Sequence, residues 1–137
     1  MLSELKIEKI RIDKSEFHFN PNFNNTSEET PLNVSYGVEM LINKEDERSA
    51  IILLRCGINL EEKFENVPFT VDTLTVGFFK VDKGDIKEYL INAISILIPY
   101  SRSHIATLTA ISGIPPVTLP AINVLRLLEE LKEQDEE

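Results

Sequence analysis

The most regular hydrophobic pattern in the chain lies between residues 32 and 42, where apolar side chains occupy every second position. These residues are Leu32, Val34, Tyr36, Val38, Met40 and Ile42. Alternation with a period of two places them on one face and predicts a β-strand with one apolar side. Residues 50–60 are apolar at almost every position, which is typical of a central strand covered on both faces. Residues 69–81 are rich in β-branched and aromatic side chains and predict a further strand.

Residues 5–19 alternate in the same way, but their apolar positions change parity twice. The apolar side chains are Leu5 and Ile7, then Ile10 and Ile12, then Phe17 and Phe19. In a regular strand each slip would turn the next group to the opposite face, so we expect a strand with bulges or a bend. Polar, turn-forming residues 20–31 follow. Four strands with short connections predict an antiparallel sheet.

After residue 84 the spacing of apolar residues becomes helical. Asp85 is a suitable capping residue for the start of a helix. The apolar positions that follow are Ile86, Tyr89, Leu90, Ala93, Ile94, Leu97 and Ile98. Pro99 has no N–H to donate to the Ser95 carbonyl, so we expect the helix to kink or restart there. The second half continues to Gly113, a residue type that commonly ends helices.

An apolar, proline-rich connector, IPPVTLP at residues 114–120, separates this helix from the last one. Asn123 is placed to cap the last helix, whose apolar stripe is Val124, Leu127, Leu128 and Leu131. Residues 133–137 are predicted to form an acidic, disordered tail. The fold prediction is one α+β domain at residues 1–132: a four-stranded antiparallel sheet, a long kinked helix, the connector and a shorter C-terminal helix.

The composition of the chain mainly excludes certain classes of function. The chain has 137 residues, with 14 Lys and Arg against 23 Asp and Glu, and a net charge of −9. Such a charge repels phosphate backbones, which argues against nucleic-acid binding, and favours a basic partner or simple solubility. No apolar run has the length of a membrane span and the first residues do not resemble a signal peptide, so we expect a cytoplasmic chain without membrane insertion. The single cysteine, Cys56, excludes an internal disulfide.

Few residue patterns in the chain indicate catalysis. His18 and His104 have no cysteine or carboxylate at metal-ligand spacing, so we expect no metal site. No glycine-rich phosphate loop or nucleophile motif occurs. We therefore expect neither a cofactor nor an enzyme activity, and a small-ligand-binding or enzymatic domain is the least favoured alternative.

Residues 97–124, LIPYSRSHIATLTAISGIPPVTLPAINV, resemble the SecB protein-export chaperones and their SecB-like relatives. The matching residues are Pro99, Tyr100, Arg102, Gly113, Pro115, Leu119, Pro120 and Asn123. IEKIRIDKSEFHF (residues 7–19) resembles the first strand of that family, and VGFFKV (residues 76–81) resembles the end of its fourth. The resemblance covers nearly the whole chain, although the middle strands match in pattern only.

The resemblance implies an ATP-independent holdase that forms homotetramers as dimers of dimers and keeps unfolded precursor proteins competent for export. Apolar contact over a long surface suits this task, because the protein must bind many sequences and offset the ordering entropy of each. We expect the client-binding groove to be walled by Val34, Tyr36, Val38, Val117, Leu119, Ile122 and Leu125. The alternative is that these side chains complete the core of the monomer. The family arrangement also places an oligomer interface at Tyr100, His104 and Thr107.

Family members deliver clients to SecA through acidic side chains on the outer face of strands one and four, and the resemblance implies Asp13, Glu16 and Asp72 for this surface. The first-strand positions that align as acidic carry Lys14 and His18 instead. This departure makes SecA a less certain partner than an unfolded client. A SecB-like chaperone dedicated to one client, such as the antitoxin of a toxin–antitoxin system, is therefore the alternative to a general export chaperone.

Overall fold

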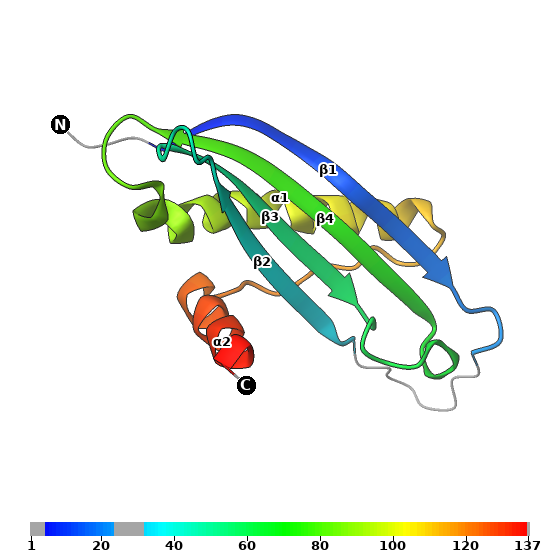
Figure 1. Ribbon diagram of the computed structural model, residues 1–137. Helices are drawn as coiled ribbons and strands as arrows, with labels where there is room; N and C mark the ends of the chain where they lie inside the picture. The colour runs from blue at the N-terminus through cyan, green and yellow to red at the C-terminus, as the bar shows by residue number, and fades with distance from the viewer. Residues whose placement is uncertain (1–4, 24–31, 137) are drawn as a thin grey trace.

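A computed structural model describes residues 5–23 and 32–136, with side chains up to residue 132. Its strands are β1 (Leu5–Phe19), β2 (Val34–Ile42), β3 (Ser49–Ile58) and β4 (Phe69–Val81). Its helices are the short 3-10 turns η1 (Phe64–Asn66) and η2 (Ile86–Tyr89), and the α-helices α1 (Leu90–Ile111) and α2 (Val124–Glu136). The strands form one antiparallel sheet in the order β1-β4-β3-β2 (Figure 1). The predicted α+β fold is confirmed.

Strand β1 is bulged, as its change of parity predicts. Its pairing with β4 shifts register between Ile7 and Lys9 and again between Ile12 and Lys14. Each shift inserts one residue into β1, which turns the following side chains to the opposite face. All three apolar groups of β1 are thereby brought to the face that α1 covers. The face is identified by the partners of these residues on β4, which include Val81, Phe79, Gly77, Thr75, Val71 and Phe69.

The core lies between this inner face of the sheet and the helices. One cluster joins β3 and the end of β4 to the first half of α1: Ala50, Ile52, Leu54, Phe79, Val81, Ile86, Ala93, Ile94, Leu97 and Ile98. A second cluster joins the other end of the sheet to the connector: Cys56, Ile58, Phe69, Val71, Ile105, Val117 and Leu119. Figure 1 shows α1 running behind the sheet, with the strands passing in front of it.

The prediction that β3 is covered on both faces is wrong. Its inward residues, such as Ile52 and Leu54, are fully buried. Ile51 and Leu53 point to the opposite face and are only half-buried. Both α-helices pack on the inner side of the sheet, α1 across β3 and β4 and α2 against β2. The second apolar face of β3 is therefore an outer surface of this chain.

Helix α1 continues without interruption through Pro99, so the restart expected there does not occur. Proline leaves the Ser95 carbonyl without its helical donor, but Ser95 and Pro99 lie on the exposed side of α1, where water can bond to that carbonyl. Asp85 caps the preceding turn, since its carboxylate accepts the Lys87 N–H at 3.0 Å. No helix in the described part of the chain is long and apolar enough to cross a membrane.

Gly113 ends α1, as predicted, with the left-handed φ of 93°. Its own N–H donates to the Ala110 carbonyl at 3.3 Å, and the Ile114 N–H donates to the Thr109 carbonyl at 3.3 Å. These bonds satisfy two of the carbonyls that a helix end leaves open. Asn123 caps α2 through its side chain, which accepts the Arg126 N–H at 3.1 Å. The backbone of the predicted acidic tail continues α2 as far as residue 136.

Candidate functional site

The apolar connector folds onto the body of its own chain. Val117 and Leu119 are 7% and 2% exposed and belong to the second core cluster. Thr109 on α1 fastens the segment, because its hydroxyl accepts the buried Val117 N–H at 2.9 Å. These two predicted groove residues therefore fill the monomer core and add almost no apolar surface, which corrects the expectation for them.

A cleft of about 240 Å³ does lie between β2 and α2. Its lining residues are Val34, Ser35, Tyr36, Glu61, Leu127, Glu130 and Leu131. Two of the predicted groove residues, Val34 and Tyr36, are thus in its wall. Leu127 and Leu131 were not among the predicted site residues, although they lie on the apolar stripe of the last helix. The direction in which α2 turns that stripe depends on how the helix docks on β2, which its own periodicity does not specify.

The other predicted groove residues divide between core and surface. Val38 and Ile122 are half-buried and pack against the first core cluster. Leu125 is 54% exposed on α2. The structure therefore brings together Val34 and Tyr36 from the sheet with residues of α2, while Leu125 lies outside that cleft.

A buried polar group lies behind the cleft. Tyr36, Cys56 and Ser101 come together there from β2, β3 and α1. Burial raises the pKa of the Cys56 thiol to about 11, and the two neighbouring hydroxyls only partly offset this effect. Burial likewise raises the pKa of the Tyr36 hydroxyl. The thiol is therefore protonated at neutral pH, and a protonated, fully buried thiol is a poor nucleophile.

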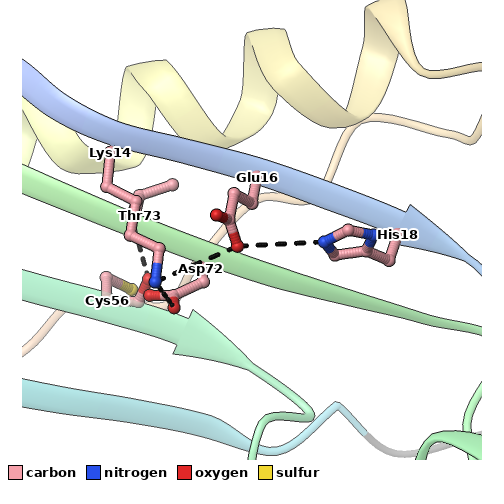
Figure 2. Close-up of polar contacts among 6 residues, drawn as sticks. All are labelled: Lys14, Glu16, His18, Cys56, Asp72 and Thr73. Carbon is pink, nitrogen blue, oxygen red and sulfur yellow. Dashed lines mark hydrogen bonds and ion pairs between the residues drawn. The ribbon is translucent and has the colours of Figure 1, made fainter.

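The acidic residues predicted to meet SecA are closely accompanied by basic side chains. On the outer face, Lys14 Nζ lies 2.6 Å from Asp72 Oδ2 and 3.9 Å from Glu16 Oε2 (Figure 2). His18 Nε2 lies 3.8 Å from the same Glu16 oxygen. The hydrogen bond to Asp72 is the main cause of the raised pKa of Lys14. Glu16 and Asp72 are cross-strand partners, so the structure joins them in one mixed-charge group.

Asp13 lies apart from that group, in the second bulge of β1. It pairs with Arg11, whose Nε lies 2.6 Å from Asp13 Oδ1. Each of the three predicted acidic residues therefore has a basic partner in the same chain. A partner that recognises bare negative charge would have to compete with these contacts.

The residues predicted to form an oligomer interface lie along one side of α1. Tyr100 is 50% exposed, Thr107 is exposed, and His104 is half-buried against β1, where its Nε2 lies 2.7 Å from Ser15 Oγ. The same side of the helix continues to Ile111, which is 77% exposed. Large apolar side chains that are exposed to solvent in one chain are a common feature of surfaces that a second chain covers.

Metal-binding groups are not gathered in the described residues, where no three His, Cys, Asp or Glu side chains are close enough to hold an ion.

Comparison with known proteins gives two sequence relatives. No family model matches the chain. An uncharacterized protein from Methanocaldococcus jannaschii is 33% identical over 114 residues, which cover 80% of this chain and 74% of that protein. The protein-export protein SecB of Anaplasma phagocytophilum is 30% identical over 109 residues, which cover 72% of this chain and 69% of that protein.

Two solved structures share the fold at low sequence identity. A SecB-like chaperone from Mycobacterium tuberculosis, solved in complex with a peptide from an antitoxin, has a TM-score of 0.71 at 15% identity, covering 87% of this chain and 91% of that one. A protein of unknown function from Streptococcus agalactiae has a TM-score of 0.55 at 14% identity, covering 88% of this chain and 100% of that one. With the shared fold and the similarity to SecB over most of both sequences, the chain belongs to the SecB family of chaperones.

Proposed function

We propose that this SecB-family chaperone is an ATP-independent holdase that binds unfolded polypeptides in apolar grooves. The observation that carries the proposal is the cleft between β2 and α2, where Val34 and Tyr36 face Leu127 and Leu131. The apolar side chains of the two elements share the wall of the cleft with Ser35, Glu61 and Glu130, so a client would contact apolar and acidic groups together. This chemistry suits clients that differ in sequence but share exposed apolar residues.

The size of the cleft sets how a client would be held. A space of about 240 Å³ accepts only a short stretch of side chains. Burial of one leucine-sized side chain contributes roughly 1.5–3 kcal/mol, and ordering the client opposes it. Stable holding therefore requires several such contacts along one polypeptide. A tetramer built as a dimer of dimers would supply four clefts, and we assign its interface to the side of α1 that carries Tyr100, His104 and Thr107.

The test is suppression of aggregation of a denatured client in the absence of ATP. We expect wild-type protein to suppress light scattering at or below equimolar tetramer. Leu131→Asp places a charge in the cleft wall and should abolish most of the suppression. Ile91→Asp is the control, because Ile91 is 42% exposed on α1 and lies outside the cleft. Failure of wild-type protein to suppress aggregation at several-fold excess would refute the holdase proposal.

A second candidate is a chaperone dedicated to one client, without delivery to SecA. Two observations favour it. The acidic residues Glu16 and Asp72 are paired with Lys14, which weakens the surface that SecA would recognise. The M. tuberculosis structure contains a SecB-like chaperone bound to an antitoxin peptide. Mass spectrometry of proteins that co-purify from the native host separates the two candidates, since a general chaperone recovers many unfolded precursors and a dedicated one recovers a single partner.

A further inference from the structure

The two bulges of β1 also determine which face of the sheet its basic residues occupy. Without them, Lys6 and Lys14 would face one side of the sheet while Lys9 and Arg11 faced the other. With them, all four basic side chains lie on the outer face, opposite α1. Their cross-strand partners on β4 are Lys80, Leu74, Phe78 and Val76, in the order Lys6, Lys14, Lys9, Arg11. Directly opposed residues of antiparallel strands share a face, so β1 presents an outward row of basic side chains, here called the basic stripe.

An apolar strip runs beside the basic stripe. It consists of accessible outward side chains of β4 and β3 together with one residue of β2: Leu41, Ile51, Leu53, Leu74 and Phe78. Val76 lies in the same row but is only 1% exposed. The strand pairing places Phe78 between Lys9 and Ile51, and Leu74 between Lys14 and Arg55. The Arg11 guanidinium stacks over the Phe78 ring, 5.0 Å from its centroid. The basic stripe and the apolar strip are therefore neighbours, on the paired strands β1 and β4.

Basic residues gather on this outer face although the chain as a whole is acidic. Lys6, Lys9, Arg11, Lys14, Arg55 and Lys80 all belong to it. They are six of the chain's 14 basic residues, in a protein whose net charge is −9. Among the described residues, Arg11 and Lys14 have acidic partners, whereas no ion pair is found for the other four. The acidic residues of these rows are Glu16 and Asp72, which lie beside Lys14, and Glu39, which pairs with Leu53. The two bulges add Asp13, which is paired with Arg11, and Glu8, which lines a hollow with Ile51 and Phe78. The excess of basic side chains therefore lies at the end of the sheet that carries Lys6, Lys9 and Lys80.

We propose that the outer face of the sheet binds an acidic, extended segment of a partner protein. An extended chain points successive side chains to opposite sides and advances about 7 Å for every two residues. The basic side chains of β1 follow one another at about the same interval. A segment in which acidic and apolar residues alternate would place its carboxylates against the basic stripe and its apolar side chains against the apolar strip.

Charge and chemistry favour a polypeptide over a nucleic acid or an anionic membrane. A polyanion extends beyond the basic stripe and meets the field of a chain with a charge of −9. At one end of the stripe it would also meet Glu16 and Asp72. A short acidic segment avoids both costs, because screening limits charge interactions to about 10 Å at moderate salt. The apolar strip gives such a segment contacts that a phosphate backbone does not use.

The experiment is calorimetric titration of the full chain with a synthetic peptide in which glutamate alternates with leucine. A second peptide with lysine in place of glutamate is the charge control. We expect the glutamate peptide to bind at least about ten-fold more tightly than the lysine peptide, with an affinity that falls as salt is raised. Equal affinities for the two peptides, or no binding of the glutamate peptide, would overturn the proposal.

Two charge-reversal variants locate the binding surface. Lys6→Glu with Lys9→Glu changes the basic stripe, whereas Lys83→Glu with Lys87→Glu makes the same change in net charge at exposed sites between β4 and α1. We expect the first pair to weaken binding of the glutamate peptide about ten-fold and the second to change it less than about two-fold. Equal losses would mean that only overall charge matters, and would overturn the assignment. So would a DNA duplex or phosphatidylserine vesicles bound as tightly as the peptide and released by the stripe variant.

The proposals for the outer face and for the β2–α2 cleft can be refuted independently of each other. Lys6→Glu with Lys9→Glu leaves the β2–α2 cleft intact, so this variant should suppress aggregation of an uncharged denatured client as well as wild type does. Leu131→Asp should lose that suppression and still bind the glutamate peptide. A stripe variant that loses suppression and peptide binding together would show that the two surfaces are one site, and would overturn the proposal of a separate acidic-segment surface.

Discussion

Thr109 provides the sharpest test of how the connector is held. Its side chain is fully buried, donates to the Ile105 carbonyl at 2.8 Å, and accepts the Val117 N–H at 2.9 Å. Thr109→Val keeps the branched shape of the side chain but removes the acceptor. The Ile105 carbonyl retains its helical partner, whereas the Val117 N–H is left buried without one. An unpaired buried donor costs about 1–3 kcal/mol, so we expect the free energy of unfolding to fall by about 2 kcal/mol.

Urea denaturation followed by circular dichroism measures this change. With a slope of about 2 kcal/mol per molar urea, a loss of about 2 kcal/mol lowers the midpoint by about 1 M. Ser95→Ala is the matched control, because Ser95 makes the same helical back-bond, to the Ile91 carbonyl at 2.8 Å, from an exposed position. We expect the control to stay within about 0.5 kcal/mol of wild type.

Hydrogen exchange at a single amide distinguishes the mechanism from a general loss of packing. In Thr109→Val, the Val117 amide should exchange faster than in wild type, while amides in the middle of β3 follow only the global change in stability. A Thr109→Val protein with wild-type stability and a protected Val117 amide would refute the reasoning, since the connector would then be held by apolar packing alone.

Three further outcomes test the core. Gly77→Ala should cost about 1–3 kcal/mol in urea unfolding, because the added methyl group would overlap the Phe79 ring and the Leu97 side chain. An unchanged midpoint would mean that both side chains move aside freely. The pKa of the Cys56 thiol is raised by folding from 9.0 to about 11, so its contribution to stability is present below pH 9 and is lost as pH rises from about 9 to 11, a loss of about 3 kcal/mol. Cys56→Ala should make this decline shallower, and an equally steep decline would contradict the assignment. Asn59→Ala should destabilise the protein by about 2 kcal/mol and so lower the thermal midpoint by several degrees. Asn59 has a left-handed φ of 60°, which alanine adopts less readily, and its side chain accepts the Asn33 N–H at 3.2 Å. A midpoint within about 1 °C of wild type would show that Asn59 does not stabilise this turn.

The periodicity of the sequence was sufficient for the order and type of the elements. Period-two alternation specified the strands, and the parity changes in residues 5–19 predicted the two bulges that the pairing of β1 confirms. Asp85 and Gly113 marked the start and end of the first helical segment because capping depends on local backbone groups. These features are determined by residues close together in the chain, which is why they could be inferred without the fold.

Only the tertiary structure decided what each apolar or charged surface contacts. Val117 and Leu119 are apolar, as residues of a binding surface would be, yet they are buried in the second core cluster. The hydrogen bond from the Val117 N–H to Thr109 holds their segment there. Lys14 and Asp72 are far apart in sequence and meet only because β1 pairs with β4. The basic stripe likewise exists only because two bulges turn residues of opposite parity to one face. Local periodicity specifies which residues of an element share a face, whereas long-range pairing and packing decide whether that face lies in the core, in the β2–α2 cleft or at the surface.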